Sequence, residues 1–153
     1  MLFRSIVSEK FNEVEGIIKK WSLGDINAEE VCIQEWNIQQ KIHFIRNIPK
    51  GISVEKMATL DAHCEFTNST NSYIQMVWFV QAINQDYHGQ NIDLKIEEFL
   101  INVGRRWYVE DIFKAFKKND RVVDALVIYE KSRANYHSVT ANTIDLLLGY
   151  EVE

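Results

Sequence analysis

Residues 73–83 read YIQMVWFVQAI, and apolar side chains occupy nearly every position of this segment. The segment is longer than most buried strands, so it predicts a central buried α-helix, with a buried strand as the competing interpretation. A polar turn at residues 67–72, TNSTNS, comes before it. The whole chain has six Gly and one Pro, which leaves little room for many tight hairpins and favours helices throughout.

The N-terminal segment also has a helical pattern, in this case with a single buried face. Its apolar residues recur at steps of four and three, which places them on one stripe. The stripe consists of Phe3, Val7, Phe11, Val14, Ile18 and Trp21. Residues 22–24 end this helix, and a short helix capped by Asp25 or Asn27 follows it.

Further helices are predicted along the rest of the chain from apolar spacing and from capping residues. They cover residues 37–48, a segment capped by Ser53, residues 94–103 ended by Gly104, residues 107–118, a segment capped by Asp120 that runs to about residue 135, and a last helix from Ser138 to Gly149. The sequence therefore predicts an all-α fold of about eight helices with short links.

The spacing of the predicted helices suggests how they are arranged. Helices that begin near Asn37, Thr70 and Trp107 start about 35 residues apart, which is the period of a solenoid of stacked helix pairs. No consensus letters repeat at that period. The alternative is an irregular helical bundle, which the spacing leaves open.

Length and charge limit the classes of protein that fit. The 153 residues suit one domain, or at most two small ones, and 17 Lys and Arg against 22 Asp and Glu give a net charge of −5. Nucleic-acid binders normally carry a basic excess, so we expect no nucleic-acid partner. No apolar run reaches the roughly 20 residues of a membrane span, and Arg4 interrupts any signal-peptide core, so we expect a cytoplasmic protein without membrane contact.

The two cysteines, Cys32 and Cys64, form neither a C-x-x-C pair nor a disulfide framework. We expect them to be reduced core thiols, with a single disulfide as the alternative.

The sequence lacks the patterns of a catalytic or metal centre. Its four histidines, His43, His63, His88 and His137, are scattered, and there is no H-E-x-x-H, P-loop, G-x-S-x-G or G-x-G-x-x-G. Residues 63–65, HCE, resemble one fragment of a zinc deaminase site, but no P-C-x-x-C follows to complete the ligand set. We therefore predict no catalytic residue, metal ligand or cofactor in this chain.

One cluster of charge does call for an explanation. Residues 104–107, GRRW, place two guanidinium groups at a helix N-terminus, where the helix dipole disfavours cations. In one interpretation Arg106 pairs with Glu110 and Arg105 reaches solvent. In the other, Arg105 binds a carboxylate, for which the forked guanidinium is well suited.

Four motifs, in order, resemble one known family. Residues 97–116, EEFLINVGRRWYVEDIFKAF, resemble its helix end, Gly-Arg and following helix, and residues 129–131 and 137–141, YEK and HSVTA, resemble its closing motifs. Upstream, Trp36, Gln40, Phe44 and Ile45 fit one family helix, and Asn71, Ser72, Ile74 and Trp78 fit another. The family is that of the C-terminal helical domain of leukotriene-A(4) hydrolase and related zinc aminopeptidases, and the resemblance covers about residues 25–150.

This resemblance implies an α–α superhelix, an armadillo-like right-handed solenoid, which forms one wall of a peptide-binding cleft. It implies that Arg105 binds the carboxylate of a peptide substrate, with Arg106 and Trp107 as neighbouring candidates. The family often has a Lys where this chain has Trp107, so a clamp of two cations is not expected here.

The resemblance also implies that catalysis takes place in a different domain. The zinc motif belongs to a catalytic domain that this sequence does not contain, so the chain is expected to be an accessory domain without catalysis of its own and to have an aminopeptidase catalytic domain as its partner. Residues 1–24 are then a linking helix, and residues 25–153 are the C-terminal-like domain. The alternative is a stand-alone helical-repeat scaffold that binds a protein partner.

Overall fold

The chain is an all-α protein, as predicted. The computed structural model describes the backbone of residues 2–151 and the side chains of residues 9–151, so Phe3 and Val7 of the N-terminal stripe lie outside the described side chains. The described residues contain no β-strand. Their helices are α1 (Leu2–Ser22), α2 (Ala28–Cys32), α3 (Ile38–Arg46), α4 (Val54–Cys64), α5 (Ser72–Asn84), α6 (Ile92–Asn102), α7 (Arg106–Lys118), α8 (Val122–Ser132), a short 3₁₀ helix (Arg133–Asn135) and α9 (Ser138–Leu148).

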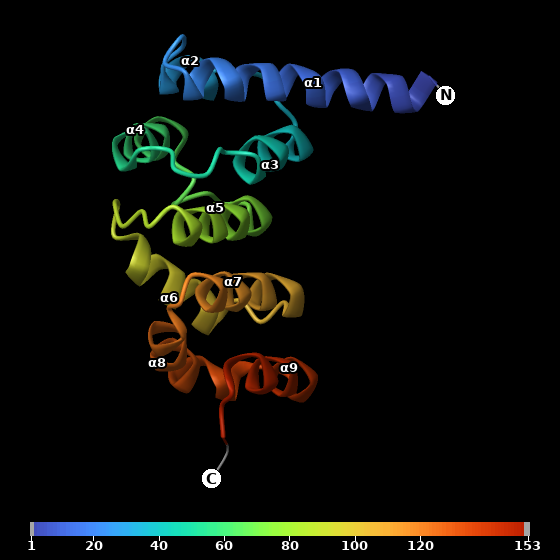
Figure 1. The fold of residues 1–153 in the computed structure, drawn as a ribbon. Coiled ribbons are helices and arrows are strands. Elements are labelled where there is room, and N and C mark those ends of the chain that lie inside the picture. Colours follow the sequence, from blue (N-terminus) through green and yellow to red (C-terminus); the bar gives the residue numbers. More distant parts are fainter. Residues whose placement is uncertain (1, 152–153) are drawn as a thin grey trace. The chain divides into compact units, whose positions relative to one another are not determined.

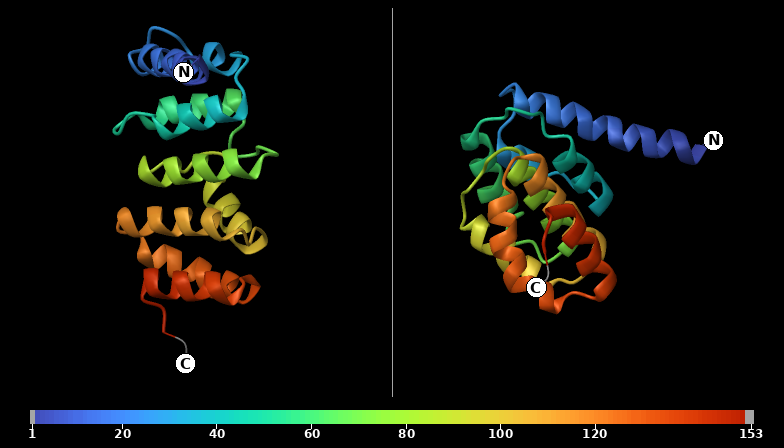
Figure 2. Two further views of the ribbon diagram at one scale, coloured as in Figure 1. Left: turned by 90° about the vertical axis from the view of Figure 1, so that its right-hand side faces the viewer. Right: turned by 60° about the horizontal axis from the view of Figure 1, so that its bottom comes forward.

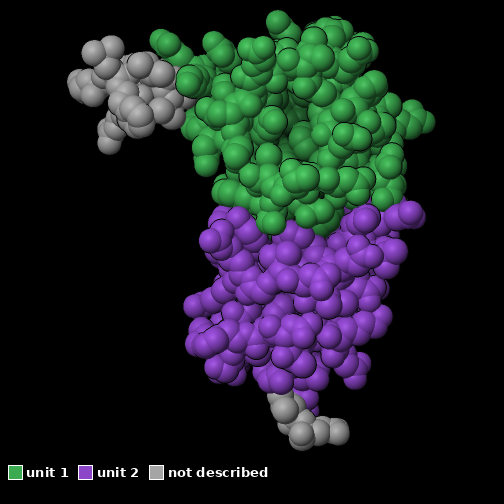
Figure 3. Space-filling model, turned by 180° about the vertical axis from the view of Figure 1, so that it is seen from behind, with its two compact units in different colours: residues 1–90 green, residues 91–153 purple. Residues whose placement is uncertain are grey.

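The helices form two compact units, Met1–Gln90 and Asn91–Glu153, which Figure 3 colours separately. In unit 1 (residues 1–90), α3 packs beside α1 on one side and α5 on the other, while α2 packs on α4 (Figure 1). In unit 2 (residues 91–153), α6 packs on α8 and α7 packs on α9 (Figure 2). Alternate helices are therefore neighbours inside each unit, and a superhelix over the whole chain stays a prediction, as does the domain boundary at residue 24.

Helix α5 is the buried helix that its apolar sequence predicts, and the competing strand does not form. Trp78 and Phe79 are fully buried, and even Gln81 is 7% exposed. A buried amide needs hydrogen-bond partners. Gln81 Nε2 donates to the carbonyl oxygen of Ile45 at 2.8 Å, which ties α5 to α3. The single polar residue among the buried positions of α5 therefore stabilises the pairing of two helices.

A buried carboxylate organises the turn before α5. Asp61 is 2% exposed and accepts hydrogen bonds from the backbone N–H of Thr67 (3.0 Å), from Thr67 Oγ1 (2.6 Å) and from Tyr87 Oη (2.9 Å). Thr67 Oγ1 in turn accepts from Trp78 Nε1 at 2.9 Å. Burial and the adjacent Asp61 raise the pKa of Tyr87 above its usual range, so its hydroxyl stays protonated and donates. These four side chains join α4, the polar turn, α5 and the loop after α5.

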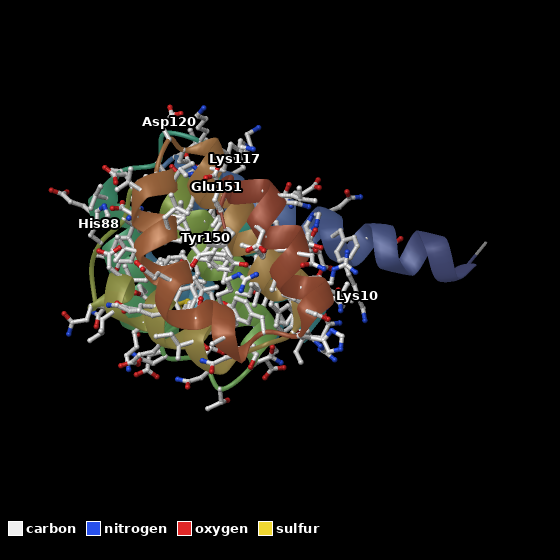
Figure 4. All side chains as sticks on the ribbon, turned by 90° about the horizontal axis from the view of Figure 1, so that it is seen from below. Lys10, His88, Lys117, Asp120, Tyr150 and Glu151 are labelled. Atoms are coloured by element: carbon white, nitrogen blue, oxygen red, sulfur yellow. A yellow bond between two sulfur atoms is a disulfide. The ribbon has the colours of Figure 1, made fainter. Side chains whose placement is uncertain are left out.

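The capping predictions are confirmed for most helices and wrong for two helix ends. Asn27, Ser53 and Gly149 occupy the expected cap positions, and Asn27 rather than Asp25 caps α2. Asp120 does not cap α8, because it has a φ of 57° in the turn that ends α7, and Arg121 precedes α8 without a capping bond. Figure 4 shows Asp120 at the outer edge of unit 2, near Lys117. The C-cap of α6 is Val103 in an extended conformation, so Gly104 is not a left-handed stop.

The expectation of two reduced thiols is wrong in this structure. Cys32 and Cys64 are joined by a disulfide, with their Cα atoms 5.2 Å apart. Each is the last residue of its helix, and because α2 packs on α4 the two helix ends meet. The alternative of a single disulfide, which the sequence left open, is the one that forms.

None of the helices that the structure describes combines the length and the apolarity needed to cross a membrane.

Candidate functional site

The GRRW segment lies at the start of α7, as the sequence predicts. Arg105 is the residue before the first helical turn, and its side chain makes no capping bond to that turn. Residues 104–107 are all exposed, whereas Tyr108 and Val109 are buried. The first turn of α7 has no acidic residue. The positive end of the helix dipole and two guanidinium groups therefore share one exposed end of α7, an arrangement that suits an anion.

Arg105 is held by Tyr108, three residues later. Its Nη1 donates a hydrogen bond to Tyr108 Oη at 3.3 Å, and its Cζ atom lies 5.3 Å from the centre of the Tyr108 ring. A guanidinium over an aromatic face is attracted to the ring and keeps its remaining N–H groups available. The exposed cation is thus oriented by a ring that is itself 6% exposed.

The Tyr108 ring packs against two other aromatic rings. Its centre lies 6.5 Å from that of Phe99 on α6 and 4.5 Å from that of Trp107. Trp107 is 39% exposed, so it also presents apolar surface next to Arg105 in the sequence. Tyr108 is not among the site residues predicted from the sequence, although the spacing of three residues on a helix would have indicated its contact with Arg105.

Arg106 has a different role from that of Arg105. Its Nε lies 3.6 Å from Glu110 Oε2, and Lys114 Nζ lies 3.6 Å from Glu110 Oε1. This i, i+4 pair is the one proposed from the sequence, so Arg106 is engaged along the surface of α7. Of the two guanidinium groups, Arg105 is the one that pairs with no acidic side chain in the described part of the chain, which makes it the better candidate for an external carboxylate.

A second polar cluster lies between α8 and α9 and has a structural character. Arg133 binds Asp145 through two hydrogen bonds, at 2.9 Å and 2.8 Å, and Tyr129 Oη donates to Asp145 Oδ1 at 2.6 Å. The bonds from Arg133 lower the pKa of Asp145, while burial and the neighbouring carboxylate raise the pKa of Tyr129 above its usual range. The Arg133 guanidinium also lies over the ring of Tyr150, which Figure 4 labels. The cluster therefore joins α8, the 3₁₀ helix, α9 and the residue Tyr150 that follows α9.

The described surface includes a groove in unit 2 and a smaller hollow in unit 1, and Arg105 lines neither of these. A groove of about 450 Å³ in unit 2 runs between α6 and α8, with Leu94 and Val127 beside Asp93, Glu97 and Asp124. A smaller hollow of about 120 Å³ in unit 1 adjoins the disulfide.

The described residues do not assemble a zinc centre. Across the described part of the chain, no three His, Cys, Asp or Glu side chains converge closely enough to hold a metal ion. His43 lies 3.2 Å from Glu15 and His88 lies 2.7 Å from Asp86, so each of these two histidines lies beside a carboxylate. Nor does the HCE segment assemble a ligand set, because Cys64 is in the disulfide.

Known proteins are similar in sequence to most of this chain. A sequence profile described as "Leukotriene A4 hydrolase, C-terminal" matches residues 36–148. The chain is 26% identical over 127 residues to "Leucine aminopeptidase 2" of Pyricularia oryzae (strain 70-15), a match that covers 78% of this chain and 20% of that protein. The chain thus spans about a fifth of the length of the curated relative that it matches.

Proposed function

This chain belongs to the leukotriene A4 hydrolase C-terminal family, and from that premise we propose that it acts as an accessory domain beside an aminopeptidase catalytic domain, where Arg105 receives the carboxylate of a peptide. The family match and the aminopeptidase relative support a C-terminal domain of an aminopeptidase-like protein.

The observation that carries the role of Arg105 is its contact with Tyr108. Most exposed arginines are flexible, and ordering them costs side-chain entropy. Arg105 is already ordered by a hydrogen bond of 3.3 Å and by the buried ring beneath it. A carboxylate from solvent can therefore accept hydrogen bonds from the guanidinium N–H groups of Arg105, which are already oriented. The positive end of the α7 helix dipole lies beside them. Trp107 offers apolar surface for the neighbouring side chain of a peptide.

The proposal assigns no chemical step to this chain. A zinc ion bound by a catalytic domain would supply the hydrolytic chemistry, and the residues described here would bind and orient the peptide. We expect the purified 153-residue chain to hold less than stoichiometric zinc by metal analysis and to hydrolyse no peptide. Aminopeptidase turnover by this chain that chelation removes would contradict this part of the proposal.

The carboxylate role can be tested by NMR on the ¹⁵N-labelled chain. The probes are trialanine as the free acid and trialanine amide, which differ in the C-terminal charge. We expect saturable shifts of the amide signals of residues 105–108 with the free acid, in the millimolar range because one exposed ion pair contributes little. The amide should bind at least about fivefold more weakly, which corresponds to the loss of a charge-assisted hydrogen bond.

Two matched variants complete this test. Arg105→Ala should abolish the preference for the free acid, whereas Arg106→Ala should retain it because Arg106 is engaged with Glu110. Equal responses to the acid and the amide in the unmodified chain would sink the proposed role of Arg105. An Arg105→Ala chain that still prefers the acid would do the same.

A further inference from the structure

The disulfide between Cys32 and Cys64 lies beside an open hollow rather than inside the core. The hollow has a volume of about 120 Å³ and is lined by both cysteines together with Gln34, Trp36, Lys41 and His63. Both cysteines are partly exposed, and His63 is exposed. A water molecule occupies about 30 Å³ in the liquid, so the hollow has room for the sulfur-bearing end of a small thiol.

The walls of the hollow suit a leaving thiolate. When a disulfide is attacked, one of its sulfurs leaves with the electron pair as a thiolate, and a nearby cation stabilises that charge. Lys41 lines the hollow, and its ammonium makes no hydrogen bond or ion pair with the residues that the structure describes. The imidazole of His63 lines the same hollow and can donate a hydrogen bond. No acidic side chain is among the lining residues.

We propose that Cys32–Cys64 is a thiol–disulfide exchange site that accepts small dithiols through this hollow, with Lys41 stabilising the leaving thiolate. This inference is independent of the proposed role of Arg105, which lies in the other unit. In the first step a thiolate of the dithiol attacks one cysteine sulfur. A mixed disulfide forms, the Cys32–Cys64 bond breaks, and the electron pair goes to the other cysteine.

In the second step the mixed disulfide is resolved. The other thiol of the reagent, as its thiolate, attacks the mixed disulfide and releases the second cysteine as a thiolate. The dithiol ends oxidised to an intramolecular disulfide, and the protein ends with two thiols, so two electrons have moved from the reagent to the protein. The two cysteine thiolates then take up protons from solvent and become thiols.

Reduction has a local structural consequence. Helix α2 has five residues, too few to be stable without tertiary contacts. It is held on α4 by two buried side chains, Ala28 and Val31, and by the disulfide at its last residue. The exchange therefore releases the C-terminal end of α2 while the apolar contacts remain, so the rest of unit 1 is expected to stay folded.

The test uses the full chain, purified in air and kept in its native state. Iodoacetamide without reductant is expected to leave both cysteines unmodified, by intact mass. Dithiothreitol without denaturant is then expected to yield a doubly alkylated protein, at a rate within about tenfold of that for the chain unfolded in guanidinium chloride. Far-UV circular dichroism should keep nearly all of its helical signal. Cysteines that are alkylated before reduction, or that resist dithiothreitol until denaturant is added, would overturn the proposal.

A pair of lysine variants tests the role of the hollow. Lys41→Gln should slow reduction of the native chain about threefold or more and leave the rate in denaturant unchanged. Lys10→Gln on α1 changes the net charge equally, lies outside the hollow and should react like the unmodified protein (Figure 4). Native reduction that is equally fast in the Lys41→Gln variant would overturn the assignment.

Discussion

The guanidinium of Arg105 lies over the ring of Tyr108, with its Cζ atom 5.3 Å from the ring centre and Nη1 3.3 Å from the phenol oxygen. One of these residues is exposed and charged, and the other is 6% exposed. The exposed cation at the start of α7 is thus attached to the core of unit 2 by a single side chain. Two substitutions of Tyr108 separate the orientation of Arg105 from the stability of that core.

Tyr108→Phe removes the acceptor of the Arg105 hydrogen bond and keeps the ring. Since the cation–π contact remains, we expect the affinity for free-acid trialanine to fall about two- to threefold, as the loss of a weak hydrogen bond predicts. The free energy of unfolding should change by less than about 1 kcal/mol. NMR titration and urea unfolding measure the two effects. Tyr108→Ala is the contrasting variant and should lower the free energy of unfolding by about 3 kcal/mol through the cavity it leaves.

Asp61→Asn should strongly destabilise unit 1. The carboxylate accepts three hydrogen bonds while 2% exposed, and an amide in its place leaves at least one buried donor without an acceptor. We expect a loss of about 2–3 kcal/mol in urea unfolding followed by circular dichroism. Asp86→Asn is the matched control, because its carboxylate is exposed and its contact with His88 contributes little. Equal effects of the two substitutions would refute the structural role of Asp61.

Asp145→Asn should change how stability depends on pH. Hydrogen bonds from Arg133 lower the pKa of Asp145 in the folded chain, below the value of about 3.9 for an unfolded aspartate. A depressed folded pKa contributes stability that is present above the unfolded pKa and is lost as pH falls through the folded pKa. The unmodified chain should therefore lose melting temperature below about pH 4 more steeply than Asp145→Asn does.

Thermal unfolding followed between about pH 7 and pH 2.5 measures this difference. At pH 7 the Asp145→Asn variant should already melt below the unmodified chain, because the pair with Arg133 is absent. The exposed Asp124, replaced in the same way, serves as the control, because its surface pair with Arg121 contributes little to stability. Parallel curves for Asp145→Asn and the unmodified chain would exclude the pair as a source of acid sensitivity.

Glu65→Gly should stabilise the protein. Glu65 is the C-cap of α4 with a φ of 55°, a left-handed conformation that a residue with a Cβ adopts at a cost. We expect the free energy of unfolding to rise by about 0.5–1 kcal/mol. Gly149 provides the reverse case, since it is the C-cap of α9 with a φ of 66°, and Gly149→Ala should lower stability by about 1 kcal/mol. The same sign of effect for both substitutions would contradict this explanation.

The helices could be predicted because each depends on nearby residues. The apolar run at 73–83 is long enough to decide between a helix and a strand, and Asn37 and Gln40 form the reciprocal capping bonds that their spacing allows. The turn at Asp120 was missed because a left-handed aspartate and an N-capping aspartate have the same sequence neighbourhood.

The candidate site was only partly predictable. The Gly-Arg motif identified Arg105 as the candidate carboxylate-binding residue, and the i, i+4 spacing predicted the pair of Arg106 with Glu110. The pairing of Cys32 with Cys64 depends on α2 packing against α4, which no local pattern encodes. The contact between Phe99 and Tyr108 that fixes the ring beneath Arg105 is likewise a product of packing between helices.

Two hydrogen bonds, one in each unit, span the same length of chain. Gln81 bonds the carbonyl of Ile45, Tyr136 bonds the carbonyl of Leu100, and each pair is 36 residues apart. The entropy lost when a loop closes grows with its length, so bonds of this span form early and at modest cost. Helical proteins, in which most contacts join residues close to each other in the sequence, fold quickly. We therefore expect each unit to refold on the millisecond timescale or faster, by adding one helix at a time to its neighbours, which limits the time during which the apolar α5 is exposed to aggregation.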